Sequence, residues 1–243
     1  MRLFDADLHV HTALSPCGAD EMTPPAIVRE ARRRGLAMLA ICDHNSARNV
    51  PAVRAAAGGD PVVLAGIEVT TAEEIHVLGL FGDDEAALAT GEAVGATLPL
   101  AGVASRRHYG AQTVCDAEGR AVDEERRLLA AASGFPLGAA VELIRRHGGL
   151  VVACHLDRPS FSVFSQLGLW PADVRFDAIE ISAADAAPPW REAVRALPHP
   201  VLRGSDAHCL DELGACRSRL RLAAPGFSEF ALALRGAGGR GVA

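Results

Sequence analysis

Two histidines near the start of the chain, His9 and His11, have the spacing of a metal-binding pair. They lie in the run DLHVHT at positions 7–12, directly after a short apolar opening. In a β-strand, side chains two residues apart point to the same face, so both imidazoles would enter one space. Neutral imidazoles bind divalent metals through a ring nitrogen. The pair alone fits two solvated surface histidines about as well.

Further acidic and imidazole side chains follow apolar runs all along the chain. The full set of candidate ligands is His9, His11, Asp43, His44, Glu68, His76, His155, Asp206 and His208. Each of them except His76 lies at or just after the carboxyl end of an expected strand. In β/α barrels that rim carries the active site, so we expect the set to converge on one pocket.

The mixture of imidazole and carboxylate groups suits Zn, Mn or Fe(II) rather than calcium or a thiolate site. Catalytic zinc uses about three protein ligands plus water, so the size of the set indicates two or three ions. Glu68 is the expected bridge, because a carboxylate has two oxygens. Paired ions about 3.5–4 Å apart activate water for attack on phosphorus. No GxSxG elbow and no GxxxxGK loop points to another chemistry.

Composition narrows the function classes. The chain has 243 residues, a formal net charge of -6 and no lysine, so all 24 basic residues are arginine. A Schiff-base or P-loop lysine is therefore excluded. The acidic balance argues against electrostatic binding of long nucleic acids. The six cysteines form no CxxC pair, and neither a signal core nor an 18-residue apolar run is present. We therefore expect reduced thiols, a cytoplasmic location and no membrane partner.

Strand and helix patterns alternate from end to end, which predicts one α/β domain with a parallel sheet or barrel. We assign it to residues 1–235, with a flexible tail at 236–243. The runs at 62–69 and 74–81 are joined so closely that a hairpin is expected. Residues 98–120 lack periodicity and suggest a lid or substrate wall. Helices are expected at 24–34, 47–57, 84–96, 123–132, 136–147, 160–167, 188–197 and 228–235.

Taken in order, the motifs resemble the PHP (polymerase and histidinol phosphatase) family from about residue 5 to 210. The motifs are DLHVHT at 7–12, CDHN at 42–45, GIE at 66–68, the strand of His76, His155, and GSDAH at 204–208. The resemblance implies a distorted seven-stranded β/α barrel and a trinuclear metal centre that hydrolyses phosphoesters. The metal ligands it implies are His9, His11, His44, Glu68, His76, His155, Asp206 and His208.

The resemblance also divides these ligands among the ions. His9 and His11 would share one ion with Glu68 and Asp206, and Glu68 would join His76 and His155 on a second. His44 and His208 would hold the third, together with a residue of the following loop. That residue is Cys17 or Asp20, or the third ion is weakly held, since the His or Asp common in the family is absent from its usual place.

Other residues are assigned roles around the ions. Asp43 is taken as catalytic through orientation of an imidazole, and Arg158 as a catalytic and substrate-binding guanidinium that grips phosphate. Arg106, in the cluster Arg106-Arg107-His108, is a weaker substrate-binding candidate. Glu180 is either a partner of a metal ligand or a polar group satisfied within its strand. Cys42, Cys154 and Cys209 are expected to be packing groups.

The function expected is metal-dependent hydrolysis of a small phosphorylated metabolite or nucleotide, by attack of metal-bound hydroxide on phosphorus. One alternative is a 5′-end exonuclease or nucleoside bisphosphate phosphatase, whose partner would be a nucleic-acid 5′ end. Another is a non-catalytic metal-binding regulatory module. A metal-dependent amidohydrolase is less favoured, because the lysine that often bridges metals there is absent.

Overall fold

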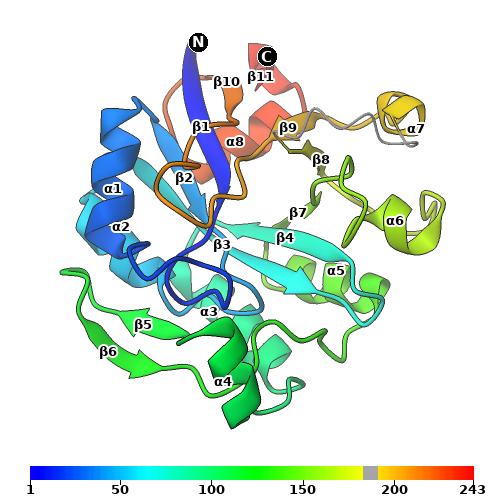
Figure 1. The fold of residues 1–243 in the computed structure, drawn as a ribbon. Coiled ribbons are helices and arrows are strands. Elements are labelled where there is room, and N and C mark those ends of the chain that lie inside the picture. The colour runs from blue at the N-terminus through cyan, green and yellow to red at the C-terminus, as the bar shows by residue number, and fades with distance from the viewer. Residues whose placement is uncertain (183–190) are drawn as a thin grey trace.

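The computed structural model describes residues 1–182 and 191–243. Its centre is a nine-stranded sheet that curves into a nearly closed barrel (Figure 1). The strand order is β11-β10-β1-β2-β3-β4-β7-β8-β9. The strands are β1 (Arg2–Val10), β2 (Met38–Ile41), β3 (Val62–Thr70), β4 (His76–Phe81), β7 (Leu150–Ala153), β8 (Ala178–Ile181), β9 (Val201–Arg203), β10 (Ser218–Leu222) and β11 (Gly241–Val242).

The expected count of seven strands is not confirmed, because the sheet continues past β1. The first half of β1 pairs with β10 in antiparallel register, and β11 pairs with β10. The last residue of β1, Val10, instead forms a bridge with Ala207, in the segment that follows β9. The segment after the last strand, β9, therefore meets β1 at the carboxyl end of β1, which is where His9 and His11 lie.

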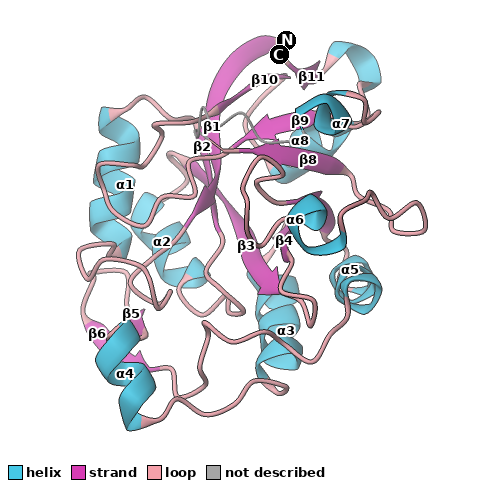
Figure 2. Cartoon of the chain, turned by 45° about the vertical axis from the view of Figure 1, so that its right-hand side comes forward, coloured by secondary structure: helices cyan, strands magenta, loops and turns pink. Residues whose placement is uncertain are grey.

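Helices cover the outer face of the sheet (Figure 2). Helices α2 and α3 pack on β3, and α5 packs on β4 and β7. Helix α1 buries its apolar residues Ile27, Val28 and Ala31, and ends before Gly35 at φ 70°. The helices are α1 (Pro24–Arg33), α2 (Val50–Ala57), α3 (Asp84–Gly95), α4 (Val103–Tyr109), α5 (Leu137–Arg146), α6 (Val163–Leu167), α7 (Arg191–Arg195) and α8 (Phe227–Leu234).

Strands β3 and β4 form the expected hairpin, with Thr70 opposite His76 and Glu68 opposite Leu78. Strand β4 is also antiparallel to β7, so it runs against both of its neighbours. The amino end of β4 therefore lies beside the carboxyl ends of β2, β3 and β7. This explains how His76, at the start of its strand, reaches the same rim as the other candidate ligands.

Two predicted elements are wrong. The helix expected at 123–132 is absent: β6 (Ala121–Glu124) pairs there with β5 (Thr113–Cys115), and turns follow. The segment expected to be a flexible tail contains a 3₁₀ turn (Ala237–Gly239) and then β11. Part of the helix expected at 188–197 lies outside the described residues. Among the described helices none is long and apolar enough to cross a membrane. All six cysteines are free.

Candidate metal centre

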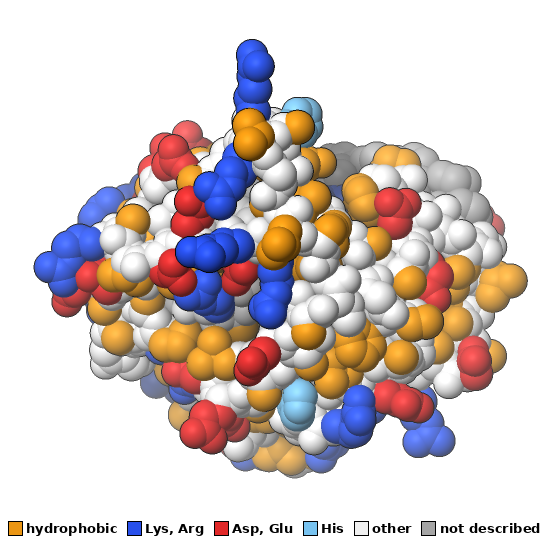
Figure 3. Space-filling model, turned by 90° about the horizontal axis from the view of Figure 1, so that it is seen from below, with side chains coloured by type: hydrophobic (Ala, Val, Ile, Leu, Met, Phe, Trp, Pro, Cys, Tyr) orange, Lys and Arg blue, Asp and Glu red, His pale blue; other side chains and the backbone are white. Residues whose placement is uncertain are grey.

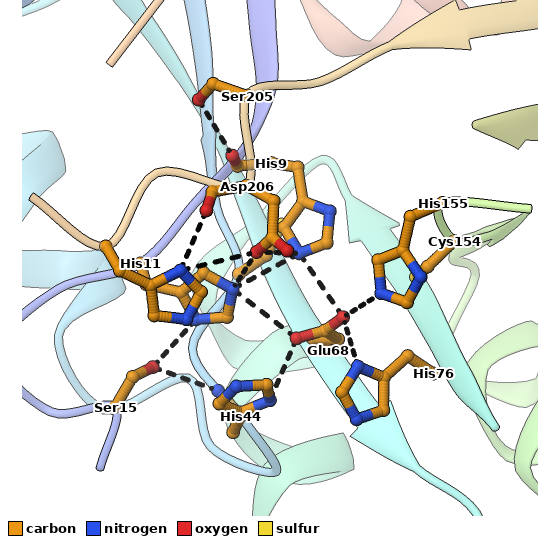
Figure 4. Close-up of polar contacts among 12 residues, drawn as sticks. His9, His11, Ser15, His44, Glu68, His76, Cys154, His155, Ser205 and Asp206 are labelled. Carbon is orange, nitrogen blue, oxygen red and sulfur yellow. Dashed lines mark hydrogen bonds and ion pairs between the residues drawn. The ribbon is translucent and has the colours of Figure 1, made fainter. Parts of the chain in front are cut away.

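Eight of the predicted side chains come together at one rim of the barrel (Figure 4). They come from the ends of β1, β3 and β4 and from the segments after β2, β7 and β9. Six of them are buried, while His44 and His208 are partly exposed. The set is His9, His11, His44, Glu68, His76, His155, Asp206 and His208.

These polar groups continue apolar rows of the barrel interior. On β3, Leu64 belongs to the buried interior cluster, and Glu68 lies on the same strand face four residues later. On β4, Leu80 and Leu78 precede His76 in the same way, read from the opposite end. Between Leu64 and Glu68, Gly66 is required, because a Cβ there would lie 2.7 Å from the carbonyl oxygen of Ile41. The barrel interior is therefore lined by apolar side chains along the strands and by ionisable side chains at the rim.

Glu68 is the hub of the cluster. Its carboxylate is fully buried and lies within 3.4 Å of five imidazoles. The distances are 2.8 Å to His44 Nδ1, 2.9 Å to His76 Nδ1, 3.3 Å to His155 Nε2, and 3.4 Å to Nε2 of both His9 and His11. Burial would raise the pKa of Glu68, but the imidazoles, led by His76, outweigh it and hold the pKa well below its usual range. Glu68 is therefore a permanent anion at the rim.

The orientation of His9 is fixed by Glu180 on β8. Nδ1 of His9 lies 3.0 Å from Oε1 of Glu180, and both residues are buried. An ionised carboxylate only accepts hydrogen bonds, so Nδ1 carries the hydrogen and the lone pair of neutral His9 is on Nε2. Gly204 leaves room for this contact, because a Cβ there would lie 2.4 Å from Oε2 of Glu180. Nε2 of His9 therefore faces Glu68 and Asp206.

A serine fixes His11 in the same way. The Ser15 hydroxyl donates to Oδ1 of Asp43 at 2.7 Å, so its oxygen accepts from Nδ1 of His11 at 2.8 Å. Asp43 also accepts from the backbone N–H and the hydroxyl of Thr12. Burial raises the pKa of Asp43 against these hydrogen bonds. Asp43 thus acts on His11 only through Ser15, and not by direct contact with its ring.

This arrangement fits divalent cations. Nε2 of His9 and Nε2 of His11 lie 3.3 and 2.9 Å from Oδ1 of Asp206. With both Nδ1 atoms donating elsewhere, the lone pairs of the neutral imidazoles face carboxylate oxygens, and a divalent cation between them would satisfy both. Oε2 of Glu68 and Oδ1 of Asp206 are buried, and each lies close to an imidazole nitrogen, Nδ1 of His44 at 2.8 Å and Nε2 of His11 at 2.9 Å. Donor atoms within 4.8 Å of one another occur in several overlapping groups, including His9, His11, Glu68 and Asp206, and also His44, Glu68 and His76.

Solved structures of other proteins resemble this chain in their fold. No protein-family model and no curated protein matches the sequence. The lesion-specific endonuclease Q of Pyrococcus furiosus is similar in structure, with a TM-score of 0.72, 20% identity and 99% of this chain covered. Endonuclease Q bound to a 27-mer duplex with an abasic lesion gives a TM-score of 0.73 at 19% identity. The chain has a PHP-type fold. The family resemblance inferred from the motifs is thus confirmed at the level of the fold.

Shorter proteins share this PHP-type fold over most of their length. A protein assigned as a metal-dependent phosphoesterase of Bifidobacterium adolescentis matches at a TM-score of 0.57 and 24% identity, over 84% of this chain and 87% of its own. An amidohydrolase of Chromobacterium violaceum matches at 0.54 and 20%, over 87% and 90%. In contrast, the chain spans only 58% of the length of the endonuclease Q chains.

Arg158 lies at the open side of this cluster. Its guanidinium forms an ion pair with Asp206, and its side chain is 35% exposed. It borders two cavities, of about 180 and 490 Å³. The smaller cavity is also lined by His76 and Phe161, whose rings stack with centroids 4.6 Å apart. Arg158 is therefore placed to meet an anion that enters from solvent.

The structure does not bring Arg106 to the centre. Arg106 lies on α4 and pairs with Glu124 of β6 at 3.0 Å, and it lines neither cavity beside the cluster. Its assignment as a substrate-binding residue stays a prediction, and in the structure it forms an ion pair between two exposed side chains of α4 and β6. Such pairs contribute at most about 1 kcal/mol.

The loop after β1 carries the two candidates for the remaining ligand. The thiol of Cys17 lies close to the imidazoles of His208 and His44. Burial would raise its pKa, but interactions with these two imidazoles outweigh burial and lower the pKa to about 7. Asp20 is exposed and lines neither cavity. Cys42 and Cys154 belong to the buried interior cluster, where burial raises the pKa of both thiols.

Two functional side chains were missed or left open by sequence reasoning. Ser15 gave no signal beyond its place in a turn-forming Ser-Pro pair. Glu180 stood out as one acid between Ile179 and Ile181, but nothing in the sequence indicated that its partner is His9. Both act on imidazoles from elsewhere in the fold or loop, so only the folded arrangement identifies them.

Proposed function

We propose that this protein is a metal-dependent phosphoesterase that acts on a small phosphorylated molecule. The observation that carries the proposal is the buried carboxylate of Glu68 with five imidazoles within 3.4 Å. Such a donor set binds divalent ions, and two or three fit its size. Bound there, the ions would lower the pKa of water and offset charge on the phosphoryl group.

The chain's own residues would orient and hold the reacting groups. Glu180 and Ser15 keep Nε2 of His9 and His11 directed at the ions. Arg158 would leave Asp206, which the ions neutralise, and take the phosphoryl oxygens in a bidentate contact. That exchange positions the anion and adds positive charge where the transition state develops negative charge. The metal ligands in this proposal are His9, His11, His44, Glu68, His76, His155, Asp206 and His208.

A second candidate is a phosphoesterase that acts at a nucleic-acid 5′ end. The structural likeness to endonuclease Q bound to a DNA duplex favours it, although the chain spans 58% of that protein. The distribution of charge on the surface gives less support to nucleic-acid binding. On the face in Figure 3, arginine side chains alternate with acidic ones. The ion pairs Arg106–Glu124 and Arg48–Asp123 illustrate the same mixing. Charge neutralised in pairs contributes little to phosphate binding along a polymer.

Phosphate release from a substrate panel tests the proposal. Chelated protein and protein reloaded with Mn²⁺ or Zn²⁺ are compared on a mononucleotide, a sugar phosphate, a short 5′-phosphorylated oligonucleotide and an abasic duplex. We expect turnover of a small phosphate only after reloading. Preference for the oligonucleotide or duplex would favour the second candidate. Full metal occupancy without turnover of any phosphoester would instead support a non-catalytic metal-binding module, and turnover of an added amide would support an amidohydrolase.

A further inference from the structure

The thiol of Cys17 lies beside the group of donor atoms that has the fewest ligands available for an ion. Cys17 is the one exposed cysteine of the six. Its loop is bound to the segment of His208, because the backbone N–H of Ala19 donates to the carbonyl oxygen of His208 at 2.8 Å. The thiol lies close enough to the imidazoles of His208 and His44 to raise the pKa of both. Cys17 also lines one cavity together with His208, so it borders the imidazoles of this group.

Without the thiol, this group has too few ligands to hold an ion. Donor atoms of His11, His44 and His208 lie within 4.8 Å of one another. However, Nδ1 of His11 is bonded to Ser15, and its Nε2 faces Asp206 at 2.9 Å and Glu68 at 3.4 Å. That leaves His208 and His44 for an ion at this position, and Nδ1 of His44 also faces Glu68 at 2.8 Å. Zinc sites take three or four protein ligands. A third donor must come from a neighbouring side chain.

His208 is oriented to share an ion with that donor. Its Nδ1 donates to the backbone carbonyl of Asp206 at 2.7 Å, so the lone pair is on Nε2. A cavity of about 490 Å³ is lined by Cys17 and His208 together with Arg158 and Asp206. Asp20, the other candidate in this loop, is exposed and does not line the cavity. Cys17 is therefore the loop residue placed to complete the group, and the cavity leaves the ion an open side.

We propose that Cys17 binds, as a thiolate, the ion held by His44 and His208, and makes this position selective for Zn²⁺ or Co²⁺ over Mn²⁺. This inference rests on the proposed metal centre and specifies one of its positions. On binding, the thiol releases its proton to solvent and the sulfur bonds to the ion. Soft thiolate ligands favour zinc, whereas manganese prefers oxygen donors. The remaining positions, built from imidazole and carboxylate, would accept either metal.

Cobalt spectroscopy tests the proposal without reference to activity. Co²⁺ is added to the chelated protein, and the sulfur-to-cobalt charge-transfer band in the near ultraviolet is recorded together with the number of bound ions. The wild type and the matched control Cys209→Ser should develop the band. Cys17→Ser should bind cobalt without the band, and its affinity for the last zinc ion should fall by more than the ~100-fold typical of losing an outer partner.

The possible results distinguish the proposed role of Cys17 from the proposed metal centre on which it rests. Cobalt bound by the wild type without the band, or a band that persists in Cys17→Ser, would overturn the role of Cys17 and leave the metal centre standing. No cobalt binding at all would overturn both. If Cys17→Ser does not fold, alkylation of the wild type decides: Zn²⁺ should protect Cys17 but not Cys209 from iodoacetamide. Equal modification of Cys17 with and without Zn²⁺ would contradict the proposal.

Discussion

Glu180 accepts a hydrogen bond from Nδ1 of His9 at 3.0 Å, and solvent reaches neither group. The pair joins β8 to β1 across 171 positions of sequence. Because the carboxylate increases the basicity of the ring and fixes its tautomer, it strengthens whatever Nε2 binds. Burial would lower the pKa of His9, but the carboxylates of Glu180, Asp206 and Glu68 outweigh it and raise the pKa well above its usual value.

The first prediction concerns this pair. Glu180→Gln keeps the shape of the side chain but removes its charge, so metal affinity should fall by about 10–100-fold while the protein still folds. Zinc titration against a competing chelator measures the change. The control is Glu142→Gln on the exposed face of α5, which should bind zinc as the wild type does. Equal affinity of the Glu180 variant and the wild type would show that His9 needs no carboxylate partner.

The second prediction concerns Ser15. Ser15→Ala removes the group between Asp43 and His11, leaving a buried carboxylate oxygen and a buried ring nitrogen each short of one partner. The free energy of unfolding of metal-free protein should fall by about 1–3 kcal/mol. Urea denaturation measures it, with Ser228→Ala on α8 as a control that should change it by less than ~0.5 kcal/mol. An equally small change at Ser15 would mean that water replaces the hydroxyl.

The third prediction concerns Arg158. Arg158→Ala should lower kcat/KM for a phosphate monoester by roughly 100-fold, because it removes charge and hydrogen bonds directed at the phosphoryl group. Arg158→Lys should recover only part of this, since an ammonium group lacks the bidentate fork. Steady-state kinetics give the ratio. The number of bound ions in both variants must equal that of the wild type, because Arg158 also pairs with the proposed metal ligand Asp206. Unchanged kcat/KM in both variants would remove Arg158 from substrate binding.

The fourth prediction is a pH dependence of stability at Asp7. Burial, opposed by hydrogen bonds from Ser205 and Gly214, raises the pKa of Asp7 from 3.8 to about 6. A raised carboxyl pKa means that the native state holds the proton more tightly than the unfolded chain. The contribution of Asp7 is therefore complete below pH 3.8 and falls by roughly 3 kcal/mol as the pH rises through 6.

The variant Asp7→Asn isolates this contribution. Asparagine does not titrate, so the difference in unfolding free energy between wild type and variant should decrease between pH 4 and pH 6.5. Urea denaturation of the chelated proteins at these two pH values gives the difference. A difference that stays constant, or grows in favour of the wild type, would place the pKa of Asp7 at or below its ordinary value.

Much of the fold could be predicted because apolar runs mark buried strands. The run ending at Ile41 is β2, and the short connection between Glu68 and His76 correctly indicated a hairpin. The helix expected at 123–132 failed because its local pattern of acids and arginines favours helix, whereas pairing with β5 decides the structure. Ladder contacts between distant segments outweigh local propensity, and the sequence pattern does not reveal them.

The ligand set was predictable for a different reason. His9, Glu68 and Asp206 each lie near the end of an apolar run. The carboxyl ends of barrel strands meet at one rim, so the position of each residue along its strand predicted that these side chains would lie close together. The supporting contacts were not predictable, since Ser15 and Glu180 are ordinary residue types in ordinary places. For Arg106, the basic cluster suggested anion binding, whereas the structure shows an ion pair with Glu124.

An anomalous difference map from crystals soaked in Mn²⁺ shows directly whether the cluster binds metal ions. We expect at least two peaks inside the cluster, each within about 2.0–2.3 Å of donor atoms, with the carboxylate of Glu68 between them. Well-ordered crystals whose map has no peak between Glu68 and the surrounding imidazoles would contradict this expectation.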